Sequence, residues 1–195
     1  MRRFSLAAAL IAIPAATVVL DNPNARVFRT SDGSLAGVDG GPGVVISLDD
    51  GPGAKAGTAV WMDNVASRMH SLLSGSLIIV QPRRPAAPPV VSPPVGSAPG
   101  EASFTGMSFT PVFENDRVRV IRARMNVGAR EGFHTHGSDT IVVHLSGGEI
   151  EDTANGKTTV NRWKRGDVEF EGRGSSHSAR NVGQAVDVVL VALKP

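Results

Sequence analysis

Cysteine and tyrosine are both absent from this chain of 195 residues. Without cysteine there can be no disulfide, thiolate ligand or cysteine nucleophile, so nitrogen and oxygen atoms must hold any bound metal. Net charge is also low, since 20 basic residues are offset by 18 acidic ones to leave +2. That field is too weak to favour nucleic acid as a partner, and no basic stripe is interleaved with aromatic residues.

A helical period of about 3.6 residues is missing beyond the N-terminal segment, whereas glycine and proline are frequent, with 22 and 13 residues. Short apolar runs bounded by turn residues predict strands, as at 141–145 and 186–193. Between two polar runs, Asn155 and Gly156 form a dipeptide typical of a tight β-hairpin turn. The predicted fold class is therefore all-β, built from short antiparallel strands.

Residues 1–16, MRRFSLAAALIAIPAA, combine a basic tip, an apolar run and small residues. This order predicts a secretory signal peptide and a periplasmic or secreted protein. The alternatives are a buried N-terminal strand or helix and, without cleavage, a cytoplasmic protein. The apolar run is shorter than the roughly 20 residues of a membrane-spanning helix, so we expect no membrane span in the mature chain.

Internal similarity divides the remaining sequence into two copies of one unit, at 17–82 and 103–195. Residues 17–30 (TVVLDNPNARVFRT) and 110–123 (TPVFENDRVRVIRA) are identical at six of fourteen positions, and three shorter similarities follow in the same order. A proline-rich linker at 83–102 separates the copies. We expect it to be extended, up to about 60 Å long, so that the copies need not touch. The alternative is a strap lying across one compact body.

Histidines are few but clustered, and His134 and His136 lie two residues apart. Alternate side chains of a strand share a face, so both imidazoles would reach one cation. Imidazole suits zinc, copper, iron and nickel. Taken alone, such a pair is also found among surface and core histidines.

The residues around this pair resemble the two sequence motifs of the cupin superfamily over about 104–195. Gly128, His134, His136 and Gly147 match the first motif, and Gly166, Gly174, His177 and Asn181 match the second. The resemblance implies two cupin-type antiparallel jelly-roll barrels, the N-terminal one degenerate. It also implies that His134, His136 and His177 hold one divalent transition metal ion (Fe²⁺, Zn²⁺, Mn²⁺ or Ni²⁺) in the second barrel.

One departure from the cupin pattern affects the expected chemistry, because the glutamate of the first motif is replaced by Thr140. A neutral hydroxyl is a poor ligand, and Asp139, the alternative ligand, lies one residue early and should point to the other face unless a bulge re-aims it. We therefore expect three histidines with an open position, as in catalytic zinc sites. Losing an anion should favour an anionic ligand. The N-terminal copy has only His70 and should be metal-free.

Other polar residues near the motifs are candidates for contacts with a ligand. Arg122 and Arg124 could clamp a carboxylate, or could be ordinary surface charges. Thr140 is a further candidate for substrate binding. His144 should face the barrel interior, either as a core histidine hydrogen-bonded to a neighbour or as a substrate contact.

No general base is evident. Glu169 and Glu171 lie on the strand that leads to Gly174 and His177 of the second motif, and one interpretation is that they face outward. Asn181 is better interpreted as a turn-bracing residue than as a ligand. The leading hypothesis is a metal-binding cupin that oxidises a small anionic metabolite by dioxygenase-like chemistry. The alternatives are a non-catalytic cupin that binds or senses a small ligand, and a structural barrel that forms a homodimer through its edges.

Overall fold

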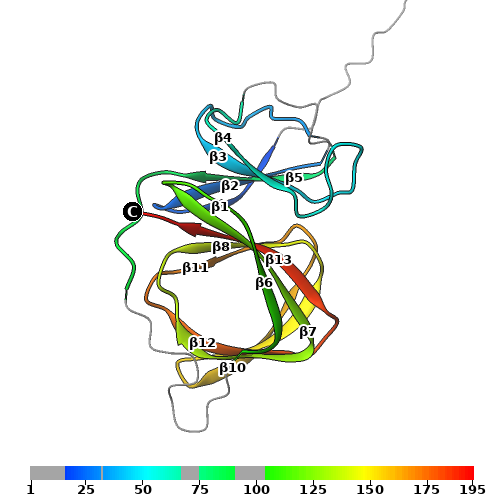
Figure 1. Ribbon diagram of the computed structural model, residues 1–195, viewed down its shortest axis with the longest axis vertical. Coiled ribbons are helices and arrows are strands. Elements are labelled where there is room, and N and C mark those ends of the chain that lie inside the picture. The colour runs from blue at the N-terminus through cyan, green and yellow to red at the C-terminus, as the bar shows by residue number, and fades with distance from the viewer. Residues whose placement is uncertain (1–15, 32, 67–74, 91–103) are drawn as a thin grey trace, which may run out of the picture.

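The computed structural model describes residues 16–31, 33–66, 75–90 and 104–195 (Figure 1). Their regular structure consists entirely of antiparallel strands, which confirms the predicted all-β class. The described residues contain no helix long and apolar enough to cross a membrane. Residues 1–15 of the predicted signal peptide, His70 and residues 91–102 of the predicted linker lie outside the described residues.

The N-terminal copy forms a five-stranded sheet with the order β1-β2-β5-β3-β4. Its strands are β1 (Thr17–Asp21), β2 (Ala25–Thr30), β3 (Gly43–Ser47), β4 (Ala59–Met62) and β5 (Leu77–Pro82). In Figure 1 this sheet lies above the C-terminal strands.

The C-terminal copy forms an eight-stranded sheet that curls into a barrel, with the order β10-β9-β12-β7-β13-β8-β11 and β6 paired with β7. Its strands are β6 (Thr105–Glu114), β7 (Val118–Thr135), β8 (Thr140–His144), β9 (Gly148–Ala154), β10 (Lys157–Trp163), β11 (Val168–Glu171), β12 (Ser176–Asn181) and β13 (Val186–Leu193). Asn155 and Gly156 turn β9 into β10, both with positive φ, as the hairpin prediction requires.

Both copies share one strand arrangement, because β6-β7-β13-β8-β11 follows the same order as β1-β2-β5-β3-β4. The turns that begin the copies are alike in detail: Asn22 accepts amide hydrogen bonds from Asn24 and Ala25, and Asn115 accepts them from Arg117 and Val118. The described N-terminal residues have no counterpart of β9, β10 or β12. They form a single sheet rather than the expected second barrel, because those three strands and the end of β7 close the C-terminal one.

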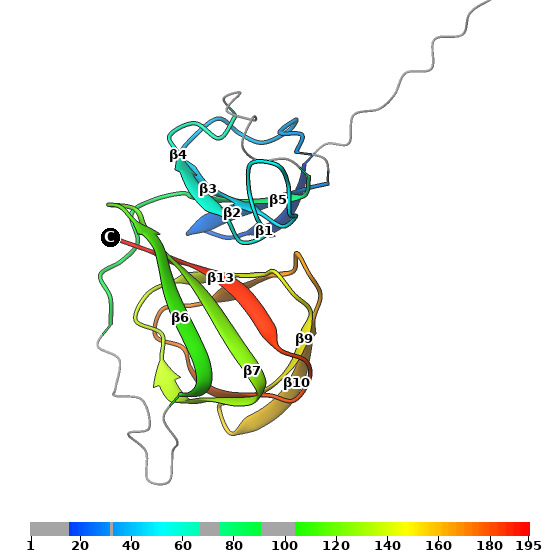
Figure 2. The same cartoon turned by 45° about the vertical axis from the view of Figure 1, so that its right-hand side comes forward.

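The two copies pack against each other, contrary to the expectation that they need not touch (Figure 2). One buried cluster joins side chains of both sheets, such as Ile46 and Val80 from the first and Val143 and Val191 from the second. The first residues of the predicted linker follow the strap alternative, since the amide of Ala86 donates to the carbonyl of Lys194.

Strand β8 is buried on both faces, which explains its nearly continuous apolar sequence. Ile141 and Val143 pack into the core shared with the N-terminal sheet, whereas Thr140, Val142 and His144 border the interior of the barrel. The barrel interior therefore has one wall that is held rigid from behind by the N-terminal copy.

Candidate metal centre

Three imidazoles meet inside the C-terminal barrel, His134 and His136 from β7 and His177 from β12. Strand β7 pairs with β13 over its first part and with β12 over its last, and Gly128 between the two parts has φ +75°. Glycine adopts this left-handed conformation without strain, so the strand can change partners there. In the second part, His177 lies directly opposite His134 in the register of the pair.

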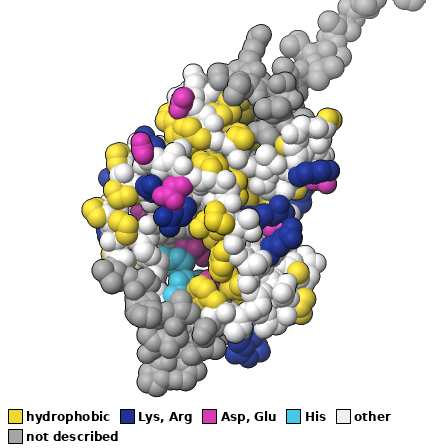
Figure 3. All heavy atoms as spheres, viewed as in Figure 1, with side chains coloured by type: hydrophobic (Ala, Val, Ile, Leu, Met, Phe, Trp, Pro, Cys, Tyr) yellow, Lys and Arg dark blue, Asp and Glu magenta, His cyan; other side chains and the backbone are white. Residues whose placement is uncertain are grey.

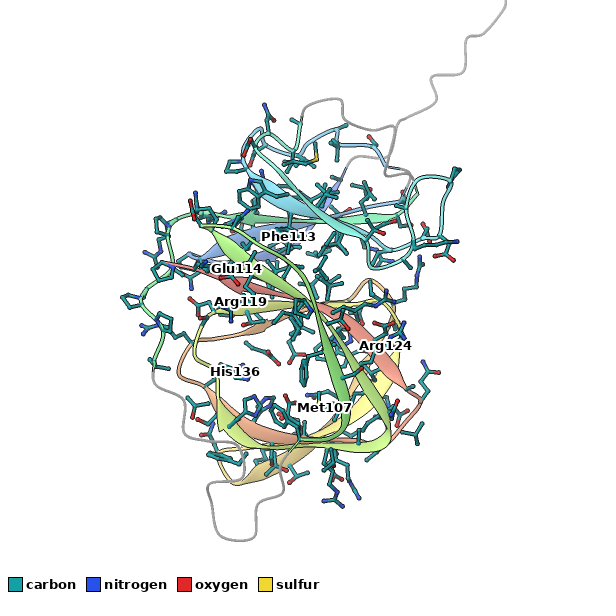
Figure 4. All side chains as sticks on the ribbon, in the orientation of Figure 1. Met107, Phe113, Glu114, Arg119, Arg124 and His136 are labelled. Carbon is teal, nitrogen blue, oxygen red and sulfur yellow. The ribbon has the colours of Figure 1, made fainter. Side chains whose placement is uncertain are left out.

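The rings form a nearly equilateral triangle. Their centroids are 4.8 Å apart for His134 and His136, 4.8 Å for His134 and His177, and 4.9 Å for His136 and His177. One nitrogen atom of each ring lies within 4.8 Å of those of the other two. Figure 4 shows His136 inside the ring of C-terminal strands.

Oxygen atoms fix the orientation of two of the rings from outside. Nδ1 of His177 lies 2.7 Å from Oδ1 of Asp152, and Nδ1 of His134 lies 3.0 Å from the carbonyl oxygen of Gly132. A carboxylate or carbonyl oxygen accepts hydrogen bonds, so Nδ1 of each ring carries the hydrogen. Nε2 is then left with a free lone pair, as metal-binding histidines require.

In the third ring, that of His136, Nδ1 also faces an oxygen atom. Nδ1 of His136 lies 3.5 Å from Oε2 of Glu171, and Nε2 of His136 lies 3.1 Å from Nε2 of His177. Two nitrogen ligands at about 2.0–2.1 Å from one ion are separated by about this distance. The geometry of the pair is therefore that of two nitrogens facing one small cation.

Several carboxyl groups lie around the triangle. Burial raises the pKa of the Glu171 carboxyl to about 8, and repulsion by neighbouring Glu169, Glu131 and Asp152 adds to it. Burial also lowers the pKa of His136 to about 4, assisted by the charges of the two other histidines. Three imidazoles beside several carboxyl groups suit a divalent transition metal ion, and the residues present therefore fit such an ion.

A cavity of about 280 Å³ opens beside the three histidines. Much of its wall is apolar and includes Met107, Met125, Val142, Ile150 and Leu190. The polar part includes Glu131, Asp152, Glu169, Glu171 and Arg124. On the face seen in Figure 3, histidine side chains lie in a hollow next to acidic and apolar side chains. Glu169 and Glu171 thus face the cavity, and the outward reading of them is wrong.

Asp139 does not face the metal centre. Its carboxylate is buried and accepts a hydrogen bond of 2.8 Å from the amide of Arg173, in a groove next to Ala86. The alternative in which Asp139 is a metal ligand is therefore wrong, because no bulge turns it inward. Thr140 borders the cavity, directly opposite Glu171 in the register of β8 and β11.

Arg122 and Arg124 clamp a carboxylate of the protein itself. Arg122 donates two hydrogen bonds to Asp187, at 2.9 and 2.7 Å, and Arg124 donates one at 3.0 Å. Arg124 borders the cavity, but the guanidinium of Arg122 lies toward the N-terminal copy at Gly57. The expected role of the two arginines in clamping a ligand carboxylate is not supported, because their guanidinium groups already donate hydrogen bonds to Asp187.

His144 faces the interior as expected but lacks the expected hydrogen-bonded neighbour. It is 3% exposed, and among the described residues neither of its ring nitrogens has a hydrogen-bond partner. Its ring stacks on Trp163, with centroids 4.7 Å apart and an interplanar angle of 18°. Asn181, by contrast, braces its turn as expected, since its amide donates to the carbonyls of Met125, Asn126 and Gln184.

Sequence reasoning did not identify Asp152 as part of the site. It lies on β9, which pairs with β12, and Asp152 is the register partner of Ala179. Nothing local to β9 marks this aspartate, because its role depends on a strand that follows later in the chain. The alternation of Glu169 and Glu171 with apolar residues was the one available signal for an inward face of β11.

No protein-family model matches this chain, and no curated protein sequence matches it. Among solved structures, a cupin domain from Bordetella pertussis Tohama I is 24% identical, with a TM-score of 0.44, over 46% of this chain and 95% of its own. The similarity to this cupin domain covers about half of the chain. The polyketide cyclase RemF from Streptomyces resistomycificus is 16% identical, with a TM-score of 0.42, over 49% of this chain and 70% of its own. The Schizosaccharomyces pombe Cnp3 cupin domain is 23% identical, with a TM-score of 0.40, over 50% of this chain and 71% of its own.

Proposed function

We propose that the cupin barrel binds one divalent transition metal ion through His134, His136 and His177 and acts on a small molecule in the adjoining cavity. The observation that carries the proposal is the arrangement of the three rings, with Nδ1 of each directed at an oxygen atom and the other nitrogens gathered together. Three protein ligands beside a cavity leave room for a further ligand, which is typical of catalytic rather than structural sites.

A bound ion would supply a Lewis acid and open coordination positions for a small molecule, including dioxygen. The protein's own residues would orient and protonate the ligand. Asp152 holds the ring of His177 in position at 2.7 Å. Glu171 borders the cavity beside His136 and is placed to exchange a proton with a bound ligand. These groups favour an enzyme, with dioxygenase-like oxidation as the proposed reaction.

A non-catalytic cupin that binds or senses a small ligand is the second candidate, and the largely apolar wall of the cavity favours it. The enzyme and the non-catalytic binding protein differ in whether a substrate is turned over. Metal-loaded protein that consumes oxygen with a small organic substrate would establish an enzyme. In that case Glu171→Gln should keep the metal and lose most of the activity.

Metal content tests the proposed site directly. Protein purified without added metal should contain about one transition metal ion per chain, whereas His134→Ala and His177→Ala should contain almost none, because two imidazoles hold such an ion poorly. His144→Phe is the matched control, since it removes a histidine that borders the same cavity but lies outside the triangle. Equal metal content in all four proteins, measured by mass spectrometry, would refute the site.

Two further expectations remain proposals. Export to the periplasm or the medium is supported by residues 1–16, and N-terminal sequencing of protein recovered from each compartment would test it. A homodimer is supported by the open edges of the C-terminal sheet, and sedimentation of the full-length protein would test it.

A further inference from the structure

The strongest feature that the metal site leaves unexplained is His144 at the end of β8. Its side chain is buried, borders the cavity, and has two ring nitrogens without hydrogen-bond partners among the described residues. Buried polar atoms are nearly always paired, and leaving one unpaired is costly. Its stacking partner Trp163 covers one face of the ring. Because His144 borders the cavity, a molecule bound there can supply a partner for the nitrogens.

Glu169 is the charged group nearest to His144, but it does not satisfy the ring. Oε2 of Glu169 lies 3.9 Å from Nε2 of His144, beyond the length of a hydrogen bond. Both residues border the cavity, so a group that enters there can reach His144. A neutral imidazole offers one donor and one acceptor, and a hydroxyl group can pair with either.

The rest of the cavity restricts the ligand further. Four carboxyl groups border it, from Glu131, Asp152, Glu169 and Glu171, against the single guanidinium of Arg124, which already pairs with Asp187. Those of the four that are ionised would repel an anion unless a metal ion compensates. The apolar wall includes flexible methionines, which adapt to apolar ligands. The volume of about 280 Å³ is at the lower end of the range of ligand pockets.

We infer that the cavity takes a small, uncharged, mostly apolar molecule with a hydroxyl group, and that this hydroxyl binds His144 away from the metal centre. His144 lies four residues beyond Thr140 on β8, a separation of about 13 Å along a strand, and Thr140 is opposite Glu171 next to the three histidines. The molecule would thus be held at both ends. The inference rests on the proposed function only for the end of the molecule next to the three histidines, where the metal ion would act.

Three probes of similar size separate the features of this ligand: 4-ethylphenol, ethylbenzene and 4-ethylbenzoate. Binding is measured by calorimetry on metal-free and zinc-loaded full-length protein, and by fluorescence in the Trp61→Phe variant, where Trp163 is the remaining tryptophan. We expect 4-ethylphenol to bind about tenfold more tightly than ethylbenzene, as one well-made buried hydrogen bond allows, and to change the emission of Trp163. The anionic 4-ethylbenzoate should bind most weakly to the metal-free protein.

The decisive variant is His144→Phe, which retains an aromatic ring to stack on Trp163 but has no nitrogen. Its affinity for 4-ethylphenol should fall about tenfold and its affinity for ethylbenzene should not change. Replacing an unpaired buried imidazole by an apolar ring should not unfold the protein. His144→Gln, which can donate and accept, should restore part of the preference for the phenol.

Each outcome bears on one proposal at a time. Equal affinities for 4-ethylphenol and ethylbenzene, an unchanged phenol preference in His144→Phe, or tightest binding of 4-ethylbenzoate to the metal-free protein would overturn the inference about His144 even if zinc binds. If zinc fails to bind but the preference for the phenol depends on His144, the proposed metal function fails and the inference about His144 stands.

Discussion

Asp152 shows how a single residue outside the triangle can govern the metal site. Its carboxylate lies 2.7 Å from Nδ1 of His177 and fixes which nitrogen of that ring faces the other two. Removing a carboxylate that supports a metal-bound histidine typically weakens metal binding by 10–100-fold. We predict a loss of about this size for Asp152→Ala, measured by competition with a metal chelator.

The matched control for Asp152 is its neighbour Glu151. Glu151 lies on the same strand but pairs with Arg180, with Oε1 3.0 Å from that guanidinium. Glu151→Gln should therefore leave the metal affinity unchanged. Similar losses in the two variants would indicate that the overall negative charge of β9, and not the orientation of His177, governs the affinity.

At the scale of strand pairs, β7 and β13 are linked by the group of Asp187 with Arg122 and Arg124. Burial acts to raise the pKa of the Asp187 carboxyl, but the hydrogen bonds and charges of the two arginines outweigh it and hold the pKa below its usual 3.8. A lowered pKa in the folded state means that this carboxylate stabilises the fold above about pH 4, and that the contribution is lost as the pH falls through the folded value.

We therefore predict that Asp187→Asn lowers the free energy of unfolding by about 1.5–3 kcal/mol at pH 7, the range for hydrogen bonds to charged groups. The difference between variant and wild type should shrink below pH 4. Urea denaturation at pH 7, 5 and 3 measures it. A difference that stays constant over this range would contradict the role of the charge.

The hairpin of β9 and β10 depends on a turn in which Asn155 has φ 52° and Gly156 has φ 71°. A residue with a β-carbon at Gly156 would be strained, since left-handed backbone costs roughly 1–2 kcal/mol. Gly156→Ala should destabilise the protein by about this amount in thermal denaturation, although nothing lies within 4 Å of the added carbon. Gly137→Ala, where the nearest atom is 3.5 Å away and φ is not positive, should have little effect.

At the scale of the whole molecule, the two sheets share one core and should unfold together. Ile46 is fully buried in the cluster that also holds Val143 and Val191. We predict that Ile46→Ala costs about 2–5 kcal/mol of stability, as large-to-small core changes do. Val19→Ala in the same sheet is the control, because Val19 is 40% exposed and surface changes are usually within about 0.5 kcal/mol.

Each sheet carries one tryptophan, which makes the prediction of joint unfolding measurable. Trp61 belongs to β4 and Trp163 to β10. In Trp163→Phe and Trp61→Phe proteins the remaining fluorescence reports one sheet at a time, and in two-state unfolding Ile46→Ala should lower both midpoints equally. A midpoint of the C-terminal sheet that does not move would show two independent domains.

The order of amino acids was enough to predict the features that depend on residues close together along the chain. Turn chemistry placed the hairpin at Asn155 and Gly156, and strand alternation put His134 and His136 on one face. The resemblance to the second cupin motif identified His177, and the internal repeat aligned Asn22 with Asn115, which the structure shows in similar turns.

Which strands are neighbours, and which side chains each face contacts, became clear from the folded protein. In the folded protein Asp152 lies next to His177, and Arg122 and Arg124 pair with Asp187. Asp139 points away from the metal centre. The N-terminal sheet covers the outer face of β8, and His144 faces the cavity. These outcomes depend on the register between strands far apart in sequence and on how the sheets pack, and no local pattern in the chain encodes either.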